Sequence, residues 1–406
     1  MKKLALNLLA WLAKLVAEKY RVKIVAVTGS VGKTTAKEAI YTVLSQTYDV
    51  GRSLYNANTE WGIVASVIQP GFEPTFTAEG KAKVTLGQLF GLVWQAKLKL
   101  LFKQPYPTIL VLELAADRPG DIQWFNRWFR YDVAVVTVIG STHVDYFKDQ
   151  AELTAEKLAL IEGVKPSGLV VLNGECERCR GVELSGARRK LVFGWANGND
   201  YWAELVSENQ YRLHHGVTAI EVKLPVGRQF GPAALIAMAV GEEFGMTPEL
   251  IQVGLEKMQP VAGRFQILKG QRWTVIDDTY NAAPESMAVA LTSLNDVARG
   301  RRVAILGEMR ELGSEKEAKH HQLGQRAAEL TDVLVAMGEA GEMIAKGARE
   351  AGMLSQNIVK LRWDPHHPKV DETISQLLPI LQDGDTVLVK ASRTIYLDRL
   401  ASKLLI

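Results

Sequence analysis

The chain has 406 residues, more than a single hydrophobic core usually supports, so at least two domains are expected. Its apolar fraction of 47% is typical of a globular protein, and its net charge of +3 is too small to indicate nucleic acid as a partner. The two cysteines, Cys176 and Cys179, form one C-x-x-C pair and lack the second pair of a structural zinc site. Such low cysteine usage is typical of a reducing compartment, and we expect a cytoplasmic protein.

Residues 1–20 are predicted to form an amphipathic helix. Lys2 and Lys3 precede an apolar run that Asn7 and Lys14 interrupt, so the run is too short to span a bilayer. Apolar side chains recur at helical spacing at Leu4, Leu8, Trp11, Leu12 and Leu15. The pattern allows two roles for this stripe, packing on its own domain or peripheral contact with a membrane surface.

Residues 21–266 are predicted to form an α/β domain with a parallel sheet. Continuous apolar runs, typical of buried parallel strands, occur at 24–27, 109–113, 133–139 and 169–173. The segment 200–226 has shorter alternating runs that predict antiparallel strands. Helical patterns occur at 36–44, 233–244 and 249–258. This alternation indicates a sheet that helices cover on both faces.

Residues 267–406 are predicted to form a smaller, Rossmann-like α/β domain, with the boundary near 263–270. Its strands are expected at 273–276, 303–306, 333–337 and 386–389. Its helices are expected at 287–294, 315–330 and 371–378. We therefore expect a P-loop ATPase domain followed by a second α/β domain.

A phosphate-binding loop follows the first predicted strand. The segment 28–35 reads T-G-S-V-G-K-T-T and lies between a strand and a helix, where backbone N–H groups and a helix N-terminus can hold phosphate. Lys33 is expected to reach the β- and γ-phosphates and Thr34 to bind Mg²⁺. The strict motif needs glycine where Val27 stands, so the shorter T-G-x-x-G-K-T-T form applies. The predicted nucleotide-binding residues are Gly29, Ser30, Val31, Gly32, Lys33, Thr34 and Thr35.

The short form of this loop resembles that of the Mur ligase family, and further segments resemble the family's motifs in the same order. They are N-A-N-T-E-W-G at 56–62, E-L at 113–114, G-D-I at 120–122, T-V-I-G at 137–140 with His143, Lys157, G-R-F at 263–265, D-D-T-Y-N-A-A-P at 277–284, G-E-M-R-E-L-G at 307–313 with His320, and K-A-S-R at 390–393. The strings at 277–284 and 307–313 are the most specific. They are most similar to the branch of the family that adds D-alanyl-D-alanine.

The resemblance implies an ATP-dependent ligase that forms amide bonds in peptidoglycan synthesis. In this family a carboxylate attacks the γ-phosphate of ATP, and an amine then displaces phosphate from the acyl phosphate. The substrates would be a cell-wall peptide precursor and an amino acid or dipeptide.

The resemblance also implies roles for individual residues. Lys33, Lys157, His143 and Arg264 would be catalytic, with Arg264 on the γ-phosphate. Asp278 and Asn281 would face ribose and adenine. Two Mg²⁺ ions would be held by Thr34, Glu113, His143 and Lys157, the lysine as a carbamate. Residues facing the substrates would be Asn56, Asn58, His320, Lys390, Ser392 and Arg393.

The chain also departs from the family pattern. About twenty residues precede the first strand, so the family's N-terminal UDP-sugar-binding domain is expected to be absent. The family's G-x-H-N-x-x-N string is replaced at Gln229, Phe230 and Ala233, and two further differences are Ala391 and Asp398. The basic amphipathic segment 86–103 could form, with the N-terminal helix, a substrate-facing or membrane-facing surface; packing on the sheet is the alternative.

Other functions stay open at this point. One is a Mur-type ligase with another substrate, either a polyglutamate or amino-acid polymer or a lipid-linked precursor. Another is a P-loop ATPase or nucleotide switch without ligase activity, which should lack the set Glu113, His143 and Lys157. A third is a non-catalytic subunit, against which Lys33 and Thr34 argue.

Overall fold

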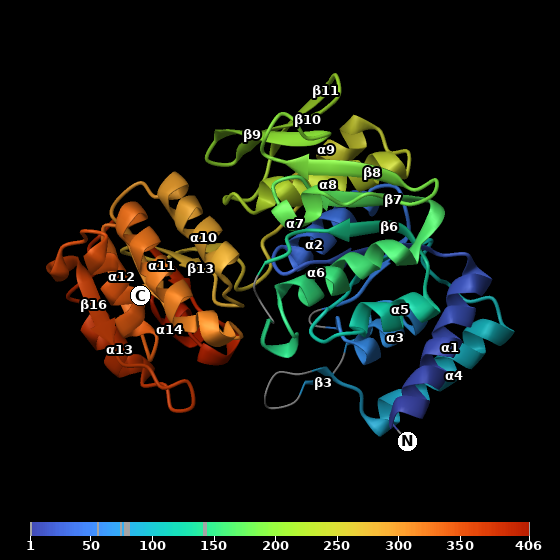
Figure 1. The fold of residues 1–406 in the computed structure, drawn as a ribbon, viewed down its shortest axis with the longest axis horizontal. Helices are drawn as coiled ribbons and strands as arrows, with labels where there is room; N and C mark the ends of the chain where they lie inside the picture. The colour runs from blue at the N-terminus through green and yellow to red at the C-terminus, as the bar shows by residue number, and fades with distance from the viewer. Residues whose placement is uncertain (1, 55–56, 74, 77–81, 141–143, 406) are drawn as a thin grey trace.

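The computed structural model describes residues 2–54, 57–73, 75–76, 82–140 and 144–405. Two large sheets dominate it, one of nine strands and one of six (Figure 1). A short hairpin, β3 (Thr75–Phe76) and β4 (Ala82–Lys83), forms a third, two-stranded sheet. The predicted α/β fold is confirmed.

The nine-stranded sheet has the order β11-β10-β9-β8-β7-β6-β1-β5-β2. Its parallel part consists of β1 (Lys23–Thr28), β2 (Val50–Arg52), β5 (Ile109–Glu113), β6 (Tyr131–Val136), β7 (Val164–Asn173) and β8 (Arg189–Gly194). The strands β9 (Tyr201–Ser207), β10 (Gln210–His215) and β11 (Thr218–Lys223) form an antiparallel meander at one edge.

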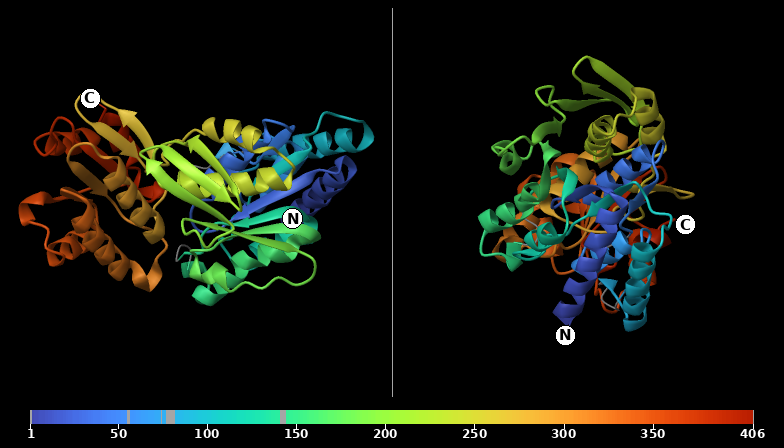
Figure 2. Two further views of the ribbon diagram at one scale, coloured as in Figure 1. Left: turned by 90° about the horizontal axis from the view of Figure 1, so that it is seen from above. Right: turned by 90° about the vertical axis from the view of Figure 1, so that its right-hand side faces the viewer.

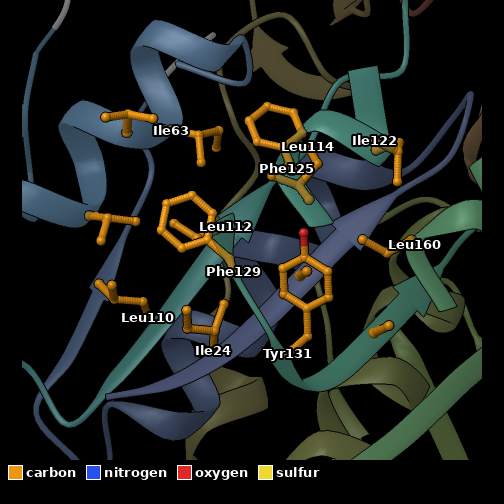
Figure 3. Packing of buried hydrophobic residues seen from close by; sticks show 14 of the residues in the cluster. Ile24, Ile63, Leu110, Leu112, Leu114, Ile122, Phe125, Phe129, Tyr131 and Leu160 are labelled. Atoms are coloured by element: carbon orange, nitrogen blue, oxygen red, sulfur yellow. The ribbon is translucent and has the colours of Figure 1, made fainter. Parts of the chain in front are cut away.

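Helices cover both faces of this sheet because successive residues of β1 point to opposite sides and are buried on both. Val25 and Val27 belong to the core beneath α2 (Lys33–Leu44), α8 (Phe230–Glu243) and α9 (Pro248–Glu256). The opposite core includes Ile24 and Ala26. Its helices are α1 (Lys2–Tyr20), α3 (Glu60–Ile68), α4 (Leu86–Leu101), α5 (Asp121–Trp128), α6 (Gln150–Leu158) and the short α7 (Glu177–Arg180). Figure 3 shows Ile63 of α3, Leu110 and Leu112 of β5 and Phe125 of α5 in this core.

The six-stranded sheet has the order β12-β13-β17-β14-β15-β16, and only β12 is antiparallel to its neighbour. The strands are β12 (Gln266–Lys269), β13 (Thr274–Asp277), β14 (Arg302–Leu306), β15 (Val333–Met337), β16 (Ile358–Leu361) and β17 (Thr386–Lys390). One face packs against α10 (Pro284–Val297), α11 (Lys316–Leu330) and α12 (Gly341–Glu350), and the other against α13 (Val370–Leu377) and α14 (Asp398–Lys403).

The predicted N-terminal helix is present, but of the predicted stripe only Leu12 belongs to the buried core. Leu4, Leu8 and Trp11 are exposed, whereas Leu9 and Ala13 are fully buried. α1 lies beside α4 at the end of the molecule remote from the six-stranded sheet (Figures 1 and 2). Within the described part of the chain, none of the helices combines the length and the apolarity needed to cross a bilayer.

The contact between α11 and α12 depends on two glycines. A Cβ at Gly324 would lie 1.9 Å from the carbonyl oxygen of Ile344, and one at Gly347 would lie 2.0 Å from that of His321. The helix backbones approach so closely that no side chain fits between them.

We predict that Gly324→Ala lowers the free energy of unfolding by about 1–3 kcal/mol, because the two helices must separate. The matched control is Gly91→Ala in α4, where an added Cβ meets no atom within 4 Å. It should raise the stability by about 0.5–1 kcal/mol through helix propensity. Urea unfolding followed by circular dichroism measures both, and equal effects would contradict the packing argument.

Candidate active site

A cleft of about 990 Å³ opens between the two sheets, and loops from both line it. On the nine-stranded side it lies where the parallel strands β1, β5 and β6 end. The carboxyl ends of parallel strands are where open α/β sheets bind ligands. Residues 30–36, at the end of β1 and the start of α2, form part of its wall.

The phosphate loop is packed against the end of β6. Gly29 has a φ of 142°, and a Cβ there would lie 2.1 Å from Thr137 Oγ1. The Thr137 hydroxyl donates to the carbonyl of Val31 over 2.6 Å. Gly32, with a φ of 85°, is the N-cap of α2, so the helix N-terminus opens directly onto the cleft. Glycine is required at both positions, once for space and once for backbone conformation.

Lys33 lies over the same loop. Its ammonium donates to the carbonyl of Gly29 at 2.8 Å and to that of Ser30 at 3.4 Å. Burial lowers its pKa, and the carboxylates of Glu113 and Asp117 partly oppose that shift. The lysine is thus a cation held at the position where a phosphate chain would lie on the loop.

A second group of side chains connects the phosphate loop, the end of β5 and the segment that leads into the second sheet. The Thr34 hydroxyl donates to Glu113 Oε2 at 2.9 Å, and Arg264 Nη2 donates to Thr34 Oγ1, also at 2.9 Å. Glu113 is buried, and the ammonium of Lys37 lies 3.7 Å from its Oε2. The Arg264 guanidinium lies 4.0 Å from the ring centroid of Tyr280, and its Nε is buried without a hydrogen-bond partner. Arg264 thereby presents its charge to the phosphate loop.

Lys157 is buried on α6, close to this group. Its Nζ lies 3.4 Å from the carbonyl oxygen of Ala116. Burial, reinforced by the nearby charge of Lys33, lowers its pKa to about 7. A substantial fraction of this amine is therefore neutral at neutral pH, unlike that of an exposed lysine.

Carboxylates surround the Lys157 amine. Burial raises the pKa of Asp121 to about 6, although its carboxylate accepts N–H bonds from Asp117 and Arg118. Glu156 accepts N–H bonds from Gly120 and Ile122, at 2.8 and 2.6 Å, and so fixes the start of α5. Residues 2–54, 57–73, 75–76, 82–140 and 144–405 contain no cluster of three or more His, Cys, Asp or Glu that could hold a metal ion.

The predicted residues of the second domain hold the loop that contains Asp278 and Asn281. Lys390 Nζ lies 2.7 Å from Asp278 Oδ2 and donates to the carbonyl of Asn281 at 2.8 Å. Burial raises the pKa of Asp278, and Lys390 opposes that shift. The Ser392 hydroxyl accepts from the Arg310 N–H at 2.9 Å. Asp278, Asn281, Lys390, Ser392 and Arg393 all line the cleft.

His320 lies elsewhere, and its expected position at the substrate is corrected. It is fully buried in α11, where Nδ1 faces the carbonyl of Lys316 at 2.7 Å and Nε2 accepts the Met309 N–H at 2.8 Å. Nε2 therefore supports the 307–313 loop from behind, while Nδ1 is held by the first turn of α11. Asn58 lines the cleft, whereas Asn56 and His143 lie outside the described residues.

Several residues in the cleft or next to it were not predicted from the sequence. Lys37 follows Lys33 by one helical turn, a spacing that places both on one side of α2. Trp195, Arg228 and Gln229 also line the cleft, and Gln229 Nε2 is buried without a partner. The departure at Gln229 from the family string was the only signal for this region.

Two family profiles match the chain. The profile described as "Mur ligase middle domain" matches residues 27–241, and the one described as "Mur ligase, glutamate ligase domain" matches residues 263–393. The chain belongs to the Mur ligase family. Members of this family are ATP-dependent ligases that join an acid to an amino acid or peptide, and this chain is such an enzyme.

Similar Mur ligases match nearly the whole chain. The UDP-N-acetylmuramoyl-tripeptide–D-alanyl-D-alanine ligase of Bacillus subtilis is 26% identical, with 98% of this chain and 79% of that enzyme covered. The ligase of the same name from Mycobacterium bovis is 30% identical, with 94% and 72% covered. The crystal structure of the MurF ligase of Thermotoga maritima in complex with ADP superposes with a TM-score of 0.78 at 26% identity, covering 98% of this chain and 82% of that one.

We predict that Arg264→Met lowers ATP turnover about 10²–10³-fold, because a cation aimed at the phosphate loop is removed. The control is Arg272→Met, which also removes an arginine next to an aromatic ring but lies outside the cleft. It should keep wild-type turnover. Phosphate release measures both, and equal losses would indicate general damage to the fold.

Proposed function

We propose that this Mur ligase joins D-alanyl-D-alanine, or a similar small amine, to the carboxylate of a UDP-muramyl peptide. The names of its relatives across 94–98% of the chain support this substrate pair. The observation that carries the proposal is the contact of Arg264 with Thr34 beside Glu113. Arg264 lies at the junction of the two proposed domains, and its guanidinium also contacts the ring of Tyr280 in the second one, so it connects that domain to the phosphate loop. A ligase needs this arrangement, since the nucleotide and the substrate carboxylate must meet in one closed site.

The residues of the cleft suit the first step of this reaction. Backbone N–H groups of 29–35 and the start of α2 would hold the triphosphate, with Lys33 on the β- and γ-phosphates. Arg264 would bind the γ-phosphate while the substrate carboxylate attacks it. Negative charge builds on the transferred group, and these cations stabilise it where it develops. The products of this step are an acyl phosphate and ADP.

The second step needs protection from water. The amine attacks the acyl carbon and phosphate leaves, but water could attack the same carbon. Arg228 contacts the second domain through Asp296 and through Ser293, whose Oγ accepts the Arg228 N–H at 3.0 Å. We propose that this contact, with that of Arg264 on Tyr280, closes a domain of residues 21–266 onto a domain of residues 267–406, with 1–20 as a separate N-terminal helix. Closure would exclude water from the acyl phosphate.

The donor set fits Mg²⁺, a hard cation that prefers oxygen ligands and retains several waters. The Thr34 hydroxyl and the Glu113 carboxylate lie 2.9 Å apart and would hold one ion. A carbamate on Lys157 would supply oxygens for a second ion, with His143 as a further proposed ligand. Bound Mg²⁺ would neutralise phosphate charge.

The surroundings of Lys157 support the carbamate. Carbon dioxide reacts only with a neutral amine, and the burial of Lys157 provides one. Conversion of the ammonium to a carbamate would also replace a cation by an oxygen ligand next to Lys33. The Asp278 and Asn281 loop would face the nucleoside, and Asn58, Lys390, Ser392 and Arg393 the incoming substrates.

We predict that phosphate release is stimulated only when UDP-muramyl tripeptide and D-alanyl-D-alanine are both present. Lys33→Met should abolish this stimulation, whereas Lys223→Met, an exposed lysine of β11, should leave it intact. Stimulation by glutamate with another carboxylate substrate would instead favour a polymer-forming ligase. ATP hydrolysis that no amine stimulates would contradict the proposal.

We also predict that Lys157 carries a carbamate whose occupancy falls as the pH drops below about 7. The sign follows from the lowered pKa: below about 7 the amine is protonated and cannot react with carbon dioxide. Carbon-13 NMR with labelled bicarbonate should show a carbamate signal that Lys157→Ala removes and Lys165→Ala retains. Degassed, bicarbonate-free buffer should lower turnover reversibly. A signal that persists in Lys157→Ala would place the modification elsewhere.

A further inference from the structure

The end of the molecule formed by α1 and α4 exposes an unusual amount of apolar surface. Eight of the sixteen large apolar side chains that the described residues expose lie on these two helices and the residue after α4. We define the α1–α4 face by its exposed members Leu4, Leu8, Trp11, Phe90, Trp94 and Leu101. Contiguous apolar surface of this kind is typical of an interaction site.

The two helices present their stripes side by side. The ammonium of Lys19, near the end of α1, donates to the carbonyls of Lys99 and Leu100 at 2.7 and 2.9 Å. The carboxyl ends of the helices therefore meet, and the helices run parallel. Figure 2 shows them next to each other on one side of the molecule. Exposed apolar residues recur at intervals of one or two helical turns, so each helix has an outer apolar stripe along its length.

Folding does not require these outer stripes. Each helix has a separate inner side: Leu9, Ala13 and Val16 of α1 and Leu92 and Ala96 of α4 are buried in the core. Phe90 is 69% exposed and Leu101 is 74% exposed, so neither stabilises the domain by burial. The apolar side chains of the face are thus available to a partner.

The charge of the segments that form this face indicates a partner of negative charge. Residues 3–21 and 86–103 carry seven basic side chains and one acidic one, a net charge of +6, whereas the whole chain is +3. The remainder of the protein is therefore net negative. Segment 86–107 contains no aspartate or glutamate, and Lys97 and Lys103 are exposed at the end of its stripe. Positive charge is concentrated where apolar side chains are exposed.

We propose that the α1–α4 face binds peripherally to an anionic lipid bilayer. Tryptophan, phenylalanine and leucine side chains would enter the region between headgroups and acyl chains, and the lysines would contact anionic headgroups. A second copy of the chain fits less well, since a symmetric contact would bring lysine against lysine. Nucleic acid would match the lysines, and its bases could stack on the tryptophans, but the exposed leucines would have no partners.

Docking in this orientation leaves the catalytic cleft accessible. The six-stranded sheet lies at the opposite end of the molecule from α1 and α4 (Figure 1). α3 packs against α1 and begins at Glu60, which lines the cleft. One helix therefore separates the membrane-facing side from the active site, while the second domain stays clear of the bilayer. The inference does not depend on the identity of the ligase substrates.

Co-sedimentation with vesicles tests the proposal. The full chain should bind vesicles of phosphatidylcholine with phosphatidylglycerol at low salt and release at high salt, and should bind phosphatidylcholine alone weakly. Phe90→Ser/Trp94→Ser should lower the partition coefficient at least about tenfold. The matched control is Leu354→Ser, since Leu354 is 63% exposed and Trp94 is 62% exposed, and it should bind as wild type. Lys97→Glu/Lys103→Glu should lower binding about 25-fold, given about fivefold per lysine.

Three results would overturn the proposal: no binding of the wild type at low salt, equal binding to both vesicle types, or unchanged binding of Phe90→Ser/Trp94→Ser. A wild-type dimer in analytical ultracentrifugation that this double variant abolishes would assign the face to self-association instead. Amine-stimulated phosphate release by the double variant should equal that of wild type. Failure of vesicle binding with intact turnover thus separates this proposal from the ligase assignment.

Discussion

The structure depends on the way β1 is held between β5 and β6. Beyond the regular ladder, the Leu114 N–H donates to the carbonyl of Val27 at 2.9 Å, and the Thr137 N–H to that of Thr28 at 3.0 Å. The Thr28 hydroxyl donates to the carbonyl of Leu114, also at 3.0 Å. These bonds fix three strand ends against one another. The phosphate loop, Glu113 and the β6 end therefore keep one geometry, and Gly29 is needed because nothing larger fits beside Thr137.

This rigid arrangement concentrates cations in a poorly solvated place. Lys33, Lys37 and Arg264 lie near the buried carboxylate of Glu113, and burial lowers the pKa of both Lys33 and Lys157. Charges removed from water without full compensation cost stability. A bound polyphosphate would provide the missing negative charge, so the features that destabilise the isolated cleft favour nucleotide binding. Uncompensated buried charge of this kind is expected at an active site rather than in a structural core.

The sequence predicted the buried parallel strands well because their signal is local. The run 109–113 coincides with β5, and the loop of 28–35 lies between β1 and α2 as expected. The short edge strands β2, β12 and β16 were missed, since partly exposed strands of three or four residues carry little periodicity. His320 shows a second limit of prediction from sequence. A histidine within a recognised motif can support a loop from behind, and only its tertiary surroundings reveal this.

The N-terminal helix shows why a helical pattern does not determine which side is buried. Leu4, Leu8 and Trp11 match helical spacing as well as the buried set does, so hydrophobicity alone cannot choose between the two sides. The space available between α1 and its neighbouring helices decides which side is buried. α1 lies against both α3 and α4, and the side that enters this junction contains Ala10, Ala13 and Ala17. Small side chains let helices approach closely, whereas Trp11 would hold them apart. The alanines thus let α1 fit this junction with Leu9 and Val16 in the core, and Leu4, Leu8 and Trp11 face outward, where the proposed bilayer contact would use them.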